Sequence, residues 1–469
     1  MNKKNNPDTK YKDASSFRDP SGYLYWQDGQ LYRFVSESYA AQYDHGKTVG
    51  LFDQLIEKQW LIPFEDLGAP KGLEDCHTVL RPSLLDFVSY PAEWCFGQIQ
   101  DAALLTLDIH LHALDHGMML KDASLYNVQF HRGKPTFIDH LSFDFYEPYG
   151  YWPAYGQFCR HFLAPLALMS RVDVGLAKLL NLHMDGVPLD LAAKILPFSS
   201  RFNFSLFAHL FLHSRYVKRY GSSRNRVAKK TIDISGAIAM ARSLRSWIAS
   251  QKAHGQKTEW GQYYSETSYS DEAMASKRDI IRGMVKRARP NRVWDIGAND
   301  GRLSRDIADI PDQIICFDID HTAVDKNYQT CKAEKYDSIL PLICDFMNPT
   351  PAIGFENRER PALLERGRPD LVLALAVIHH FAISNNVPLG HLAAFFAKMT
   401  PNLLIEFVPK DDEMVQRLLA NRADIFPDYT PEGFEQAFGT FFDIVDVKSI
   451  ADSPRRLYLL RNLRGAACK

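Results

Sequence analysis

The sequence contains no run of apolar residues long enough to span a bilayer, which takes about 18 residues or more. Residues 1–16 are polar and include no apolar signal core, so we expect a disordered tail and no membrane insertion. The seven cysteines are scattered without a C-x-x-C pair, which argues against a zinc ribbon and favours reduced thiols in a cytoplasmic protein. The formal net charge of −1 provides no overall attraction to nucleic acid, so we expect no nucleic-acid partner.

What the sequence does contain is typical of a large globular protein. Of its 469 residues, 46% are hydrophobic and 24% are charged. After the tail we expect an α+β domain over 17–250, a linker with a helix over 251–289, and an α/β domain over 290–469. One segment, 215–230, is strongly basic. It is either a solvated loop or a point of attraction for an anionic partner.

The most informative stretch is Val293-Trp294-Asp295-Ile296-Gly297-Ala298-Asn299-Asp300-Gly301. A short apolar strand leads into an acidic residue, two glycines follow, and a helical pattern begins at Arg302. Glycine lets the backbone turn tightly and come close to a ligand where a Cβ would collide. The N–H groups at the start of a helix add a partial positive charge. The stretch therefore predicts a site for a nucleoside or carboxylate ligand at the end of a parallel strand.

Four further apolar runs each lead into polar or acidic residues. The second run ends in Asp318, the third in Asp345 with Phe346 after it, the fourth leads into His379-His380, and the fifth ends in Glu406. A carboxylate at the tip of the second strand can accept both hydroxyls of a ribose. An acid after the third strand can accept from an adenine amino group, and the aromatic ring beside it can stack on the base.

Residues from about 290 to 462 resemble a class I S-adenosylmethionine-dependent methyltransferase domain. The resemblance rests on the D-I-G-A-N-D-G loop, the acids after the second and third strands, and the His-His-Phe turn after the fourth. It implies a Rossmann-like sheet of seven strands that ends in an antiparallel pair at 442–450 and 456–460, with S-adenosylmethionine as the cofactor. Carried over by position, the methionine part would be held by Asp295, Gly297, Ala298 and Gly301, the ribose by Asp318, and the adenine by Asp345 and Phe346.

Methyl transfer also needs an aligned acceptor and often a base for the acceptor proton. His379 and His380 follow the strand beside which this family binds substrate, and a histidine with a pKa near neutrality is a suitable base. Alternatively, one of the two points into the core and hydrogen-bonds the backbone. The Asp/Asn-Pro-Pro-Tyr/Phe motif of enzymes that methylate base amino groups is absent, which disfavours DNA or RNA as the substrate. Aromatic residues ahead of this domain, among them Tyr264 and Tyr269, could form a lid over the cofactor or pack the two domains together.

The N-terminal half carries a second pattern. Residues 22–26 and 30–35 predict a β-hairpin around Asp28-Gly29, and the spacing of leucines predicts a helix from 92 to 116. A loop, two short strands and a turn follow, and they contain L-K-D-A-S-L-Y-N and a second strand that ends in Asp139.

This pattern resembles the catalytic loop and metal-binding aspartate of protein-kinase-like and aminoglycoside-phosphotransferase-like folds. The resemblance implies that Asp122 orients an attacking hydroxyl, that Asn127 and Asp139 hold Mg²⁺, and that Mg·ATP is a second cofactor. However, no Phe-Gly follows Asp139, no glycine-rich phosphate loop is visible, and Arg33 and Lys47 are poor candidates for the strand lysine. The alternative is that the two aspartates cap turns and that Asn127 satisfies the backbone of a loop.

Over its whole length the chain resembles bacterial methyltransferases related to host-specific nodulation proteins, on residues 89–94, the L-K-D-A-S-x-Y-N loop and residues 378–386. We therefore predict methyl transfer from S-adenosylmethionine to a small-molecule or glycan acceptor. One alternative is an ATP- and Mg-dependent phosphotransferase whose C-terminal domain senses S-adenosylmethionine. Another is a binding protein built from two degenerate folds.

Overall fold

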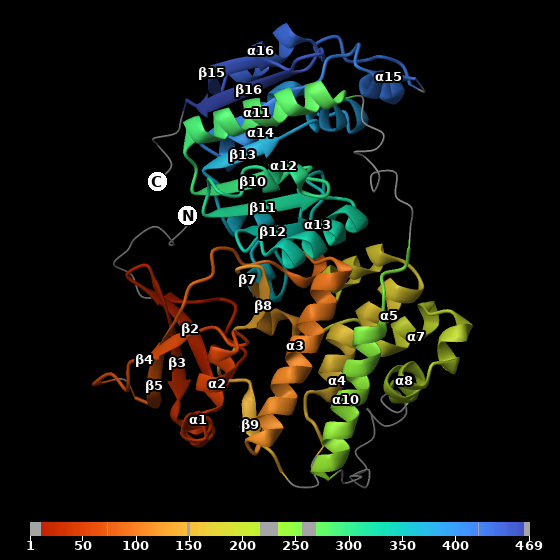
Figure 1. Ribbon diagram of the computed structural model, residues 1–469. Coiled ribbons are helices and arrows are strands. Elements are labelled where there is room, and N and C mark those ends of the chain that lie inside the picture. The colour runs from red at the N-terminus through yellow and green to blue at the C-terminus, as the bar shows by residue number, and fades with distance from the viewer. Residues whose placement is uncertain are drawn as a thin grey trace. The chain divides into compact units, whose positions relative to one another are not determined.

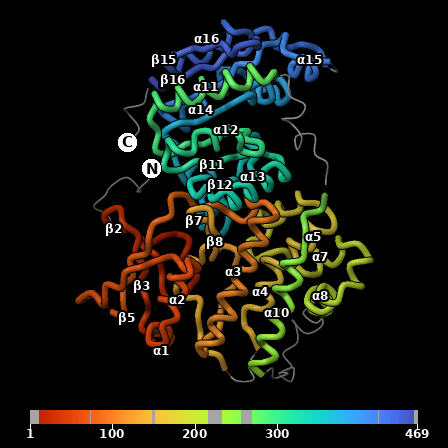
Figure 2. Tube along the Cα trace, viewed as in Figure 1, coloured from red at the N-terminus to blue at the C-terminus, as the bar shows by residue number. Residues whose placement is uncertain are grey.

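The structure is a computed structural model that describes residues 11–72, 74–147, 151–215, 233–255, 269–420 and 422–463 (Figures 1 and 2). The chain divides into two compact units. The N-terminal unit comprises Met1–Gly255 and Pro351–Ala362, and the C-terminal unit comprises Gln256–Thr350 and Leu363–Lys469. The expected tail up to residue 10, the basic segment beyond Arg215, and Tyr264 lie outside the described residues.

The N-terminal unit begins with a five-stranded antiparallel sheet in the order β1-β2-β3-β5-β4. Its strands are β1 (Tyr11–Lys12), β2 (Gly22–Gln27), β3 (Gln30–Ser36), β4 (Phe64–Asp66) and β5 (Cys76–Pro82). The expected hairpin is β2–β3, and Asp28 and Gly29 at its tip have φ of 52° and 73°, as a two-residue type I′ turn requires. The expectation of a disordered tail over 1–16 is wrong for Tyr11 and Lys12, which form β1 and pair with Trp26 and Tyr25 of β2.

Helices make up most of the rest of this unit. The expected long helix is α3 (Phe96–Asp115), and Gly117, with φ of 71°, ends it. α10 (Ile234–Ser250) runs beside α3 (Figure 2), where Arg245 forms a bidentate ion pair with Asp108 at 2.6 and 3.0 Å. The other α-helices in the described part of this unit are α1 (Ala40–Thr48), α2 (Leu51–Glu57), α4 (Tyr155–Phe158), α5 (Ala164–Arg171), α6 (Leu179–Leu182), α7 (Leu189–Ile195) and α8 (Phe204–Leu206). Two strand pairs complete the unit: β6 (Met118–Leu120) with β9 (Phe143–Phe145), and β7 (Val128–His131) with β8 (Lys134–Phe137).

The C-terminal unit is built on a seven-stranded sheet in the order β12-β11-β10-β13-β14-β16-β15. Its strands are β10 (Arg292–Ile296), β11 (Gln313–Asp318), β12 (Ile339–Ile343), β13 (Leu371–Ala374), β14 (Asn402–Phe407), β15 (Phe442–Ser449) and β16 (Arg456–Asn462). β10 to β14 are parallel, while β16 is antiparallel to both β14 and β15. From β10 the chain first adds β11 and β12 on one side of the sheet and then β13 and β14 on the other. Ligands of open α/β sheets bind at such a switch point, which here lies between β10 and β13. The expected α/β class is confirmed for this unit.

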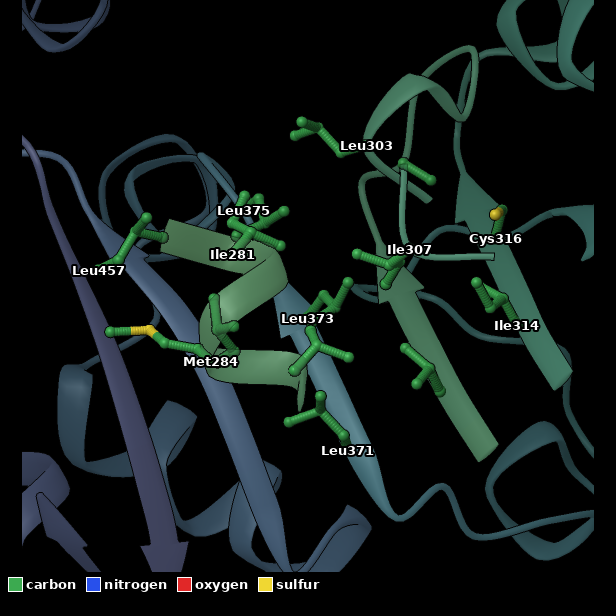
Figure 3. Packing of buried hydrophobic residues seen from close by; sticks show 14 of the residues in the cluster. Ile281, Met284, Leu303, Ile307, Ile314, Cys316, Leu371, Leu373, Leu375 and Leu457 are labelled. Carbon is green, nitrogen blue, oxygen red and sulfur yellow. The ribbon is translucent and has the colours of Figure 1, made fainter. Parts of the chain in front are cut away.

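Apolar side chains cover both faces of this sheet. Its helices are α11 (Asp271–Ala288), α12 (Arg302–Arg305), α13 (His321–Glu334), α14 (Leu389–Met399), α15 (Glu413–Leu419) and α16 (Pro431–Gly439). On one face, Ile281 and Met284 of α11 join the cluster of Leu371, Leu373 and Leu457 (Figure 3). Strand alternation turns the next residues to the other face, where Phe434 of α16 packs on rings of β14 and β16, and a ring of α14 packs on another ring of α16. Each such buried side chain contributes roughly 1.5–3 kcal/mol, which fixes the strand ends that carry the site.

Residues 351–362 are part of the N-terminal unit, although the expected boundaries place them in the C-terminal domain. The buried Glu359 pairs with Arg18 at 2.7 Å, and the rings of Phe355 and Phe17 are 5.9 Å apart. The guanidinium of Arg360 lies 4.7 Å from the ring centre of Tyr126. This short excursion between β12 and β13 therefore shares its packing with residues more than 200 positions earlier in the chain.

Candidate active site

The loop after β10 is held against β11 by its own backbone. The N–H groups of Gly297 and Ala298 both donate to the carbonyl of Phe317, at 2.8 and 3.0 Å. Gly297 and Gly301 have φ of 75° and 74°, which favours glycine at both positions. A Cβ on Gly297 would lie 2.2 Å from Cγ1 of Val377, in the loop after β13. The sequence predicted that these glycines leave room for a ligand, whereas Gly297 also leaves room for the neighbouring loop.

Asp295 is a buried carboxylate at the end of β10, with only 2% of its surface exposed. Its Oδ2 accepts a hydrogen bond from Ser304 at 2.5 Å, and its Oδ1 has no partner among the described residues. Burial raises the pKa of Asp295 to about 6, and the nearby Asp318 adds to the effect. A buried charge with an uncommitted oxygen is costly in a folded chain and therefore points to a ligand.

Asp318 stands at the end of β11, beside the glycine loop. Its two oxygens accept from the backbone N–H groups of Asn299, at 2.7 Å, and Asp320, at 2.9 Å. Burial raises the pKa of Asp318 to about 6 in spite of these hydrogen bonds. Each carboxylate oxygen can accept more than one hydrogen bond, so both remain able to receive ribose hydroxyls. Asp320, which caps α13, keeps one buried oxygen without a partner in the described part of the chain.

The predicted adenine residues differ in what the structure allows them to do. Asp345 accepts the backbone N–H of Met347 at 2.9 Å and remains half-buried at the end of β12. Phe346 is only 7% exposed, and its ring meets those of Phe317 and Phe395 edge-on, with centres 5.4 and 6.4 Å away. The ring of Phe346 is therefore largely buried, and its stacking on adenine stays a prediction.

The loop after β13 has an unusual backbone. Ala376 has φ of 53°, a conformation that costs a non-glycine residue about 1 kcal/mol and that recurs at functional sites. A π-helical turn, His380–Ser384, follows, and such turns are also frequent at functional sites. His379 is buried against His380, with ring centres 4.2 Å apart, and its Nδ1 has no partner among the described residues.

Neither histidine has the pKa expected of a general base. Burial lowers the pKa of His379 well below its ordinary value, and His380, Arg455 and Lys277 lower it further. Burial and Arg455 lower the pKa of His380 to about 4. The expectation that either residue has a pKa near neutrality is therefore wrong. A neutral imidazole in this position can still accept or donate a hydrogen bond.

A buried ionic network lies at the end of β14, on the face that α11 covers, and the sequence did not predict it. Lys277 of α11 pairs with Glu406 at 2.6 Å, and Arg455 pairs with Asp412 at 2.7 Å. Tyr269 donates to Glu406 and accepts from Arg455 at 2.9 Å, so it binds within its own unit. Burial alone would raise the pKa of Glu406, but Lys277 and Arg455 hold it below its ordinary value. Glu406 at a strand end was visible in the sequence, whereas nothing there linked it to cations 129 positions earlier and 49 later.

The three kinase-like residues of the N-terminal unit also come together. Asn127 donates from Nδ2 to the hydroxyl of Ser142 at 3.2 Å, and that hydroxyl donates to Asp139. Burial raises the pKa of Asp122 to about 6, and the nearby Asp139 contributes. Asp122 accepts from the backbone N–H of Ser124 at 3.0 Å, as the turn-capping alternative predicts. Within the described ranges, no three histidine, cysteine, aspartate or glutamate side chains are placed to hold a metal ion.

Comparison with known proteins identifies the family of this chain. No family model matches it. Nodulation protein NoeA of Rhizobium meliloti (strain 1021) is 35% identical to it over 464 residues, which is 95% of each chain. The chain belongs to the NoeA family. The match extends over the residues of both units.

Solved structures similar to this NoeA-family chain are far more distant. N-methyltransferase NodS from Bradyrhizobium japonicum WM9, in complex with S-adenosylhomocysteine, is 12% identical, with a TM-score of 0.31 over 44% of this chain and 100% of NodS. The bifunctional kinase-methyltransferase WbdD is 15% identical, with a TM-score of 0.30 over 43% of this chain and 42% of WbdD. These values are too low to carry an argument about function. In the described part of the chain, no helix is both long and apolar enough to cross a membrane.

Proposed function

We propose that this NoeA-family protein is an S-adenosylmethionine-dependent methyltransferase and that its C-terminal unit holds the cofactor. The observation that carries the proposal is the row of acids after β10, β11 and β12, namely Asp295, Asp318, Asp320 and Asp345. Among the described residues, Asp295 and Asp320 each keep a buried oxygen without a partner. The cofactor supplies a sulfonium methyl group that an acceptor atom displaces in line. All other contributions come from the residues of this chain.

Each acid has a part of the cofactor that suits its surroundings. Asp318 accepts the two ribose hydroxyls, because both its oxygens are already held in place by backbone N–H groups. Asp295 faces the cationic amino group of the methionine part, because a buried carboxylate with an uncommitted oxygen favours a positive partner. Asp345 accepts the adenine amino group. The glycines at 297 and 301 keep the connecting loop in the left-handed conformation that brings these acids together.

His379 orients the acceptor and does not act as a strong base. Its lowered pKa keeps the imidazole neutral at physiological pH, and its uncommitted Nδ1 can take a hydrogen bond from an acceptor hydroxyl or amine. The acceptor is a small molecule or a glycan. The absence of the base-methylation motif and the net charge of −1 support this assignment over nucleic acid.

Calorimetry with S-adenosylhomocysteine on the full chain tests the cofactor assignment. Asp318→Ala should weaken binding by about 1–3 kcal/mol, because two ribose hydroxyls lose a charged acceptor. The matched control is Asp309→Ala, which removes an exposed aspartate of the same unit that pairs with Arg282. Absence of binding by the wild type, or equal affinity of the Asp318 variant and the control, would refute the assignment.

A labelled cofactor tests the acceptor. Incubation of the protein and methyl-labelled S-adenosylmethionine with separate small-molecule, polysaccharide, nucleic-acid and protein fractions should label one of the first two. Label confined to nucleic acid or protein would overturn the acceptor class while leaving the cofactor assignment intact.

A further inference from the structure

The N-terminal unit contains a cluster of charged side chains that the methyltransferase reaction does not use. Asp122 and Asp139 come from the loop and the strand that resemble a kinase catalytic site, and Asp19 lies within electrostatic reach of both. Arg33 of β3 and Lys121 supply the positive charges. A kinase-like site would require Asp139 and Asn127 to offer oxygen atoms to Mg²⁺, which demands near-octahedral coordination.

The oxygens of Asp139 are already in use. Arg33 Nη1 lies 2.5 Å from Oδ1 of Asp139, and the backbone N–H of Leu141 donates to the same oxygen at 3.3 Å. The other oxygen accepts from the hydroxyl of Ser142, which in turn accepts from the amide of Asn127. The side chains of Arg33 and Asp139 are 10% and 14% exposed, so little water screens the pair. A metal ion at Asp139 would therefore have to displace a guanidinium that never loses its charge.

The rest of the cluster is equally unsuited to a nucleoside triphosphate. The hairpin β2–β3 closes with a two-residue turn, Asp28 and Gly29, between the paired Gln27 and Gln30. So short a turn has no glycine-rich loop whose N–H groups could surround phosphates, and it carries a carboxylate. The three aspartates and two cations of the cluster sum to a charge of −1, which repels a triphosphate that lacks its metal.

We propose that Arg33 takes the place of the divalent cation, so that the cluster around Asp139 binds neither Mg²⁺ nor a metal nucleotide. The guanidinium neutralises Asp139 and holds the loop of Asp122 and Asn127 in order, which in a working kinase-like site is the role of the metal. At the metal position itself, Arg33 is the residue at which the kinase-like pattern and its magnesium disagree. The inference is independent of the methyltransferase assignment, which concerns the other unit.

Mn²⁺ is a suitable probe because the sharp electron paramagnetic resonance lines of the free ion broaden and lose height when it binds to a protein. Wild type and Arg81→Met, the matched control on the exposed arginine of β5, should bind Mn²⁺ at the Asp139 site only weakly and equally. Arg33→Met removes the competing charge at similar length and should bind Mn²⁺ at least about a hundredfold more tightly than wild type, since one like charge a few ångströms away is removed. Arg33→Met/Asp139→Asn should lose the gain. Far-UV circular dichroism and the melting temperature establish that each variant is folded.

Three results would overturn the proposal. The first is tight wild-type binding of Mn²⁺ or Mn·ATP that Asp139→Asn abolishes, because Arg33 would then yield to the metal. The second is a folded Arg33→Met that gains no Mn²⁺ affinity. The third is a gain that survives the added Asp139→Asn change. If Arg33→Met does not fold, Arg33→Gln, which keeps a donor for Asp139, provides the same comparison.

Discussion

The buried carboxylate of Asp295 should lower the stability of the protein while it strengthens cofactor binding, and Asp295→Asn tests both effects. The side chain is 2% exposed, and burial raises its pKa from 3.8 to about 6. A pKa that is higher in the folded chain means that the charged form is disfavoured there. At pH 7 this difference amounts to about 3 kcal/mol, from about 1.4 kcal/mol for each pKa unit.

Asparagine removes the charge and keeps an oxygen that can accept from Ser304. Its new N–H groups need partners, which offsets part of the gain, so we expect the free energy of unfolding to rise by about 1–2 kcal/mol at pH 7. The same change should weaken S-adenosylhomocysteine binding. Hydrogen exchange in peptides that cover β10, measured along a urea series, reports the opening of this unit separately from the N-terminal one.

The pH dependence distinguishes this explanation from a better-packed side chain. As the pH falls through about 6 towards 4, Asp295 takes up a proton in the folded state before it does so in the unfolded state. The stability advantage of Asp295→Asn should therefore shrink over that range and disappear below it. Asp309→Asn, which removes an exposed carboxylate whose pKa Arg282 lowers to about 2, should give no stabilisation. An unstabilised Asp295→Asn, or a gain that does not change with pH, would refute the reasoning.

Three further outcomes follow from the same unit. Gly297→Ala should abolish S-adenosylhomocysteine binding and lower the melting temperature, because its Cβ would meet Val377 at 2.2 Å, whereas Gly283→Ala in α11, with open space around the new Cβ, should stabilise the protein by up to about 1 kcal/mol; equal effects of the two would contradict the loop geometry. Lys277→Met should lower the free energy of unfolding in urea by about 3 kcal/mol, because it leaves Glu406 buried without its 2.6 Å partner. The double variant Lys277→Met/Glu406→Leu should recover most of that loss. A Lys277→Met variant as stable as the wild type would contradict this network. S-Adenosylhomocysteine affinity, measured by calorimetry from pH 5 to 8, should fall below about pH 6 as Asp318 takes up its proton, and a constant affinity would exclude the charged carboxylate as the ribose acceptor.

The parallel strands of the C-terminal unit were predictable because they are short, mainly apolar runs bounded by polar residues. Strands buried on both faces have this composition, so β10 to β14 were visible without knowledge of their neighbours. The acids at the strand ends were visible for the same reason, since a charge directly after a buried strand must lie at the edge of the sheet. Position along the chain thus located Asp295 and Asp318.

What the sequence could not reveal depends on contacts between distant residues. The core position of Phe346 depends on Phe317 and Phe395, and a ring that follows an acid looks the same whether it stacks on a ligand or on the core. The low pKa of His379 comes first from its burial, and Arg455 and Lys277, about 75 positions after it and about 100 before it, lower the pKa further. The assignment of residues 351–362 to the N-terminal unit depends on partners such as Arg18 and Tyr126.

The two groups of acids in this chain differ in whether their oxygens have partners, and this difference separates a site that needs a ligand from one that does not. In the C-terminal unit, Asp295 and Asp320 each keep a buried oxygen without a partner among the described residues, which costs free energy and leaves that oxygen able to accept from a ligand. In the N-terminal unit, Asp139 stands where a kinase would hold its metal, yet both its oxygens accept hydrogen bonds and Arg33 neutralises it. Similar acids at strand ends therefore lead to opposite conclusions. In the C-terminal unit a buried carboxylate oxygen has no protein partner among the described residues and can bind a ligand, whereas in the N-terminal unit an arginine already neutralises the carboxylate.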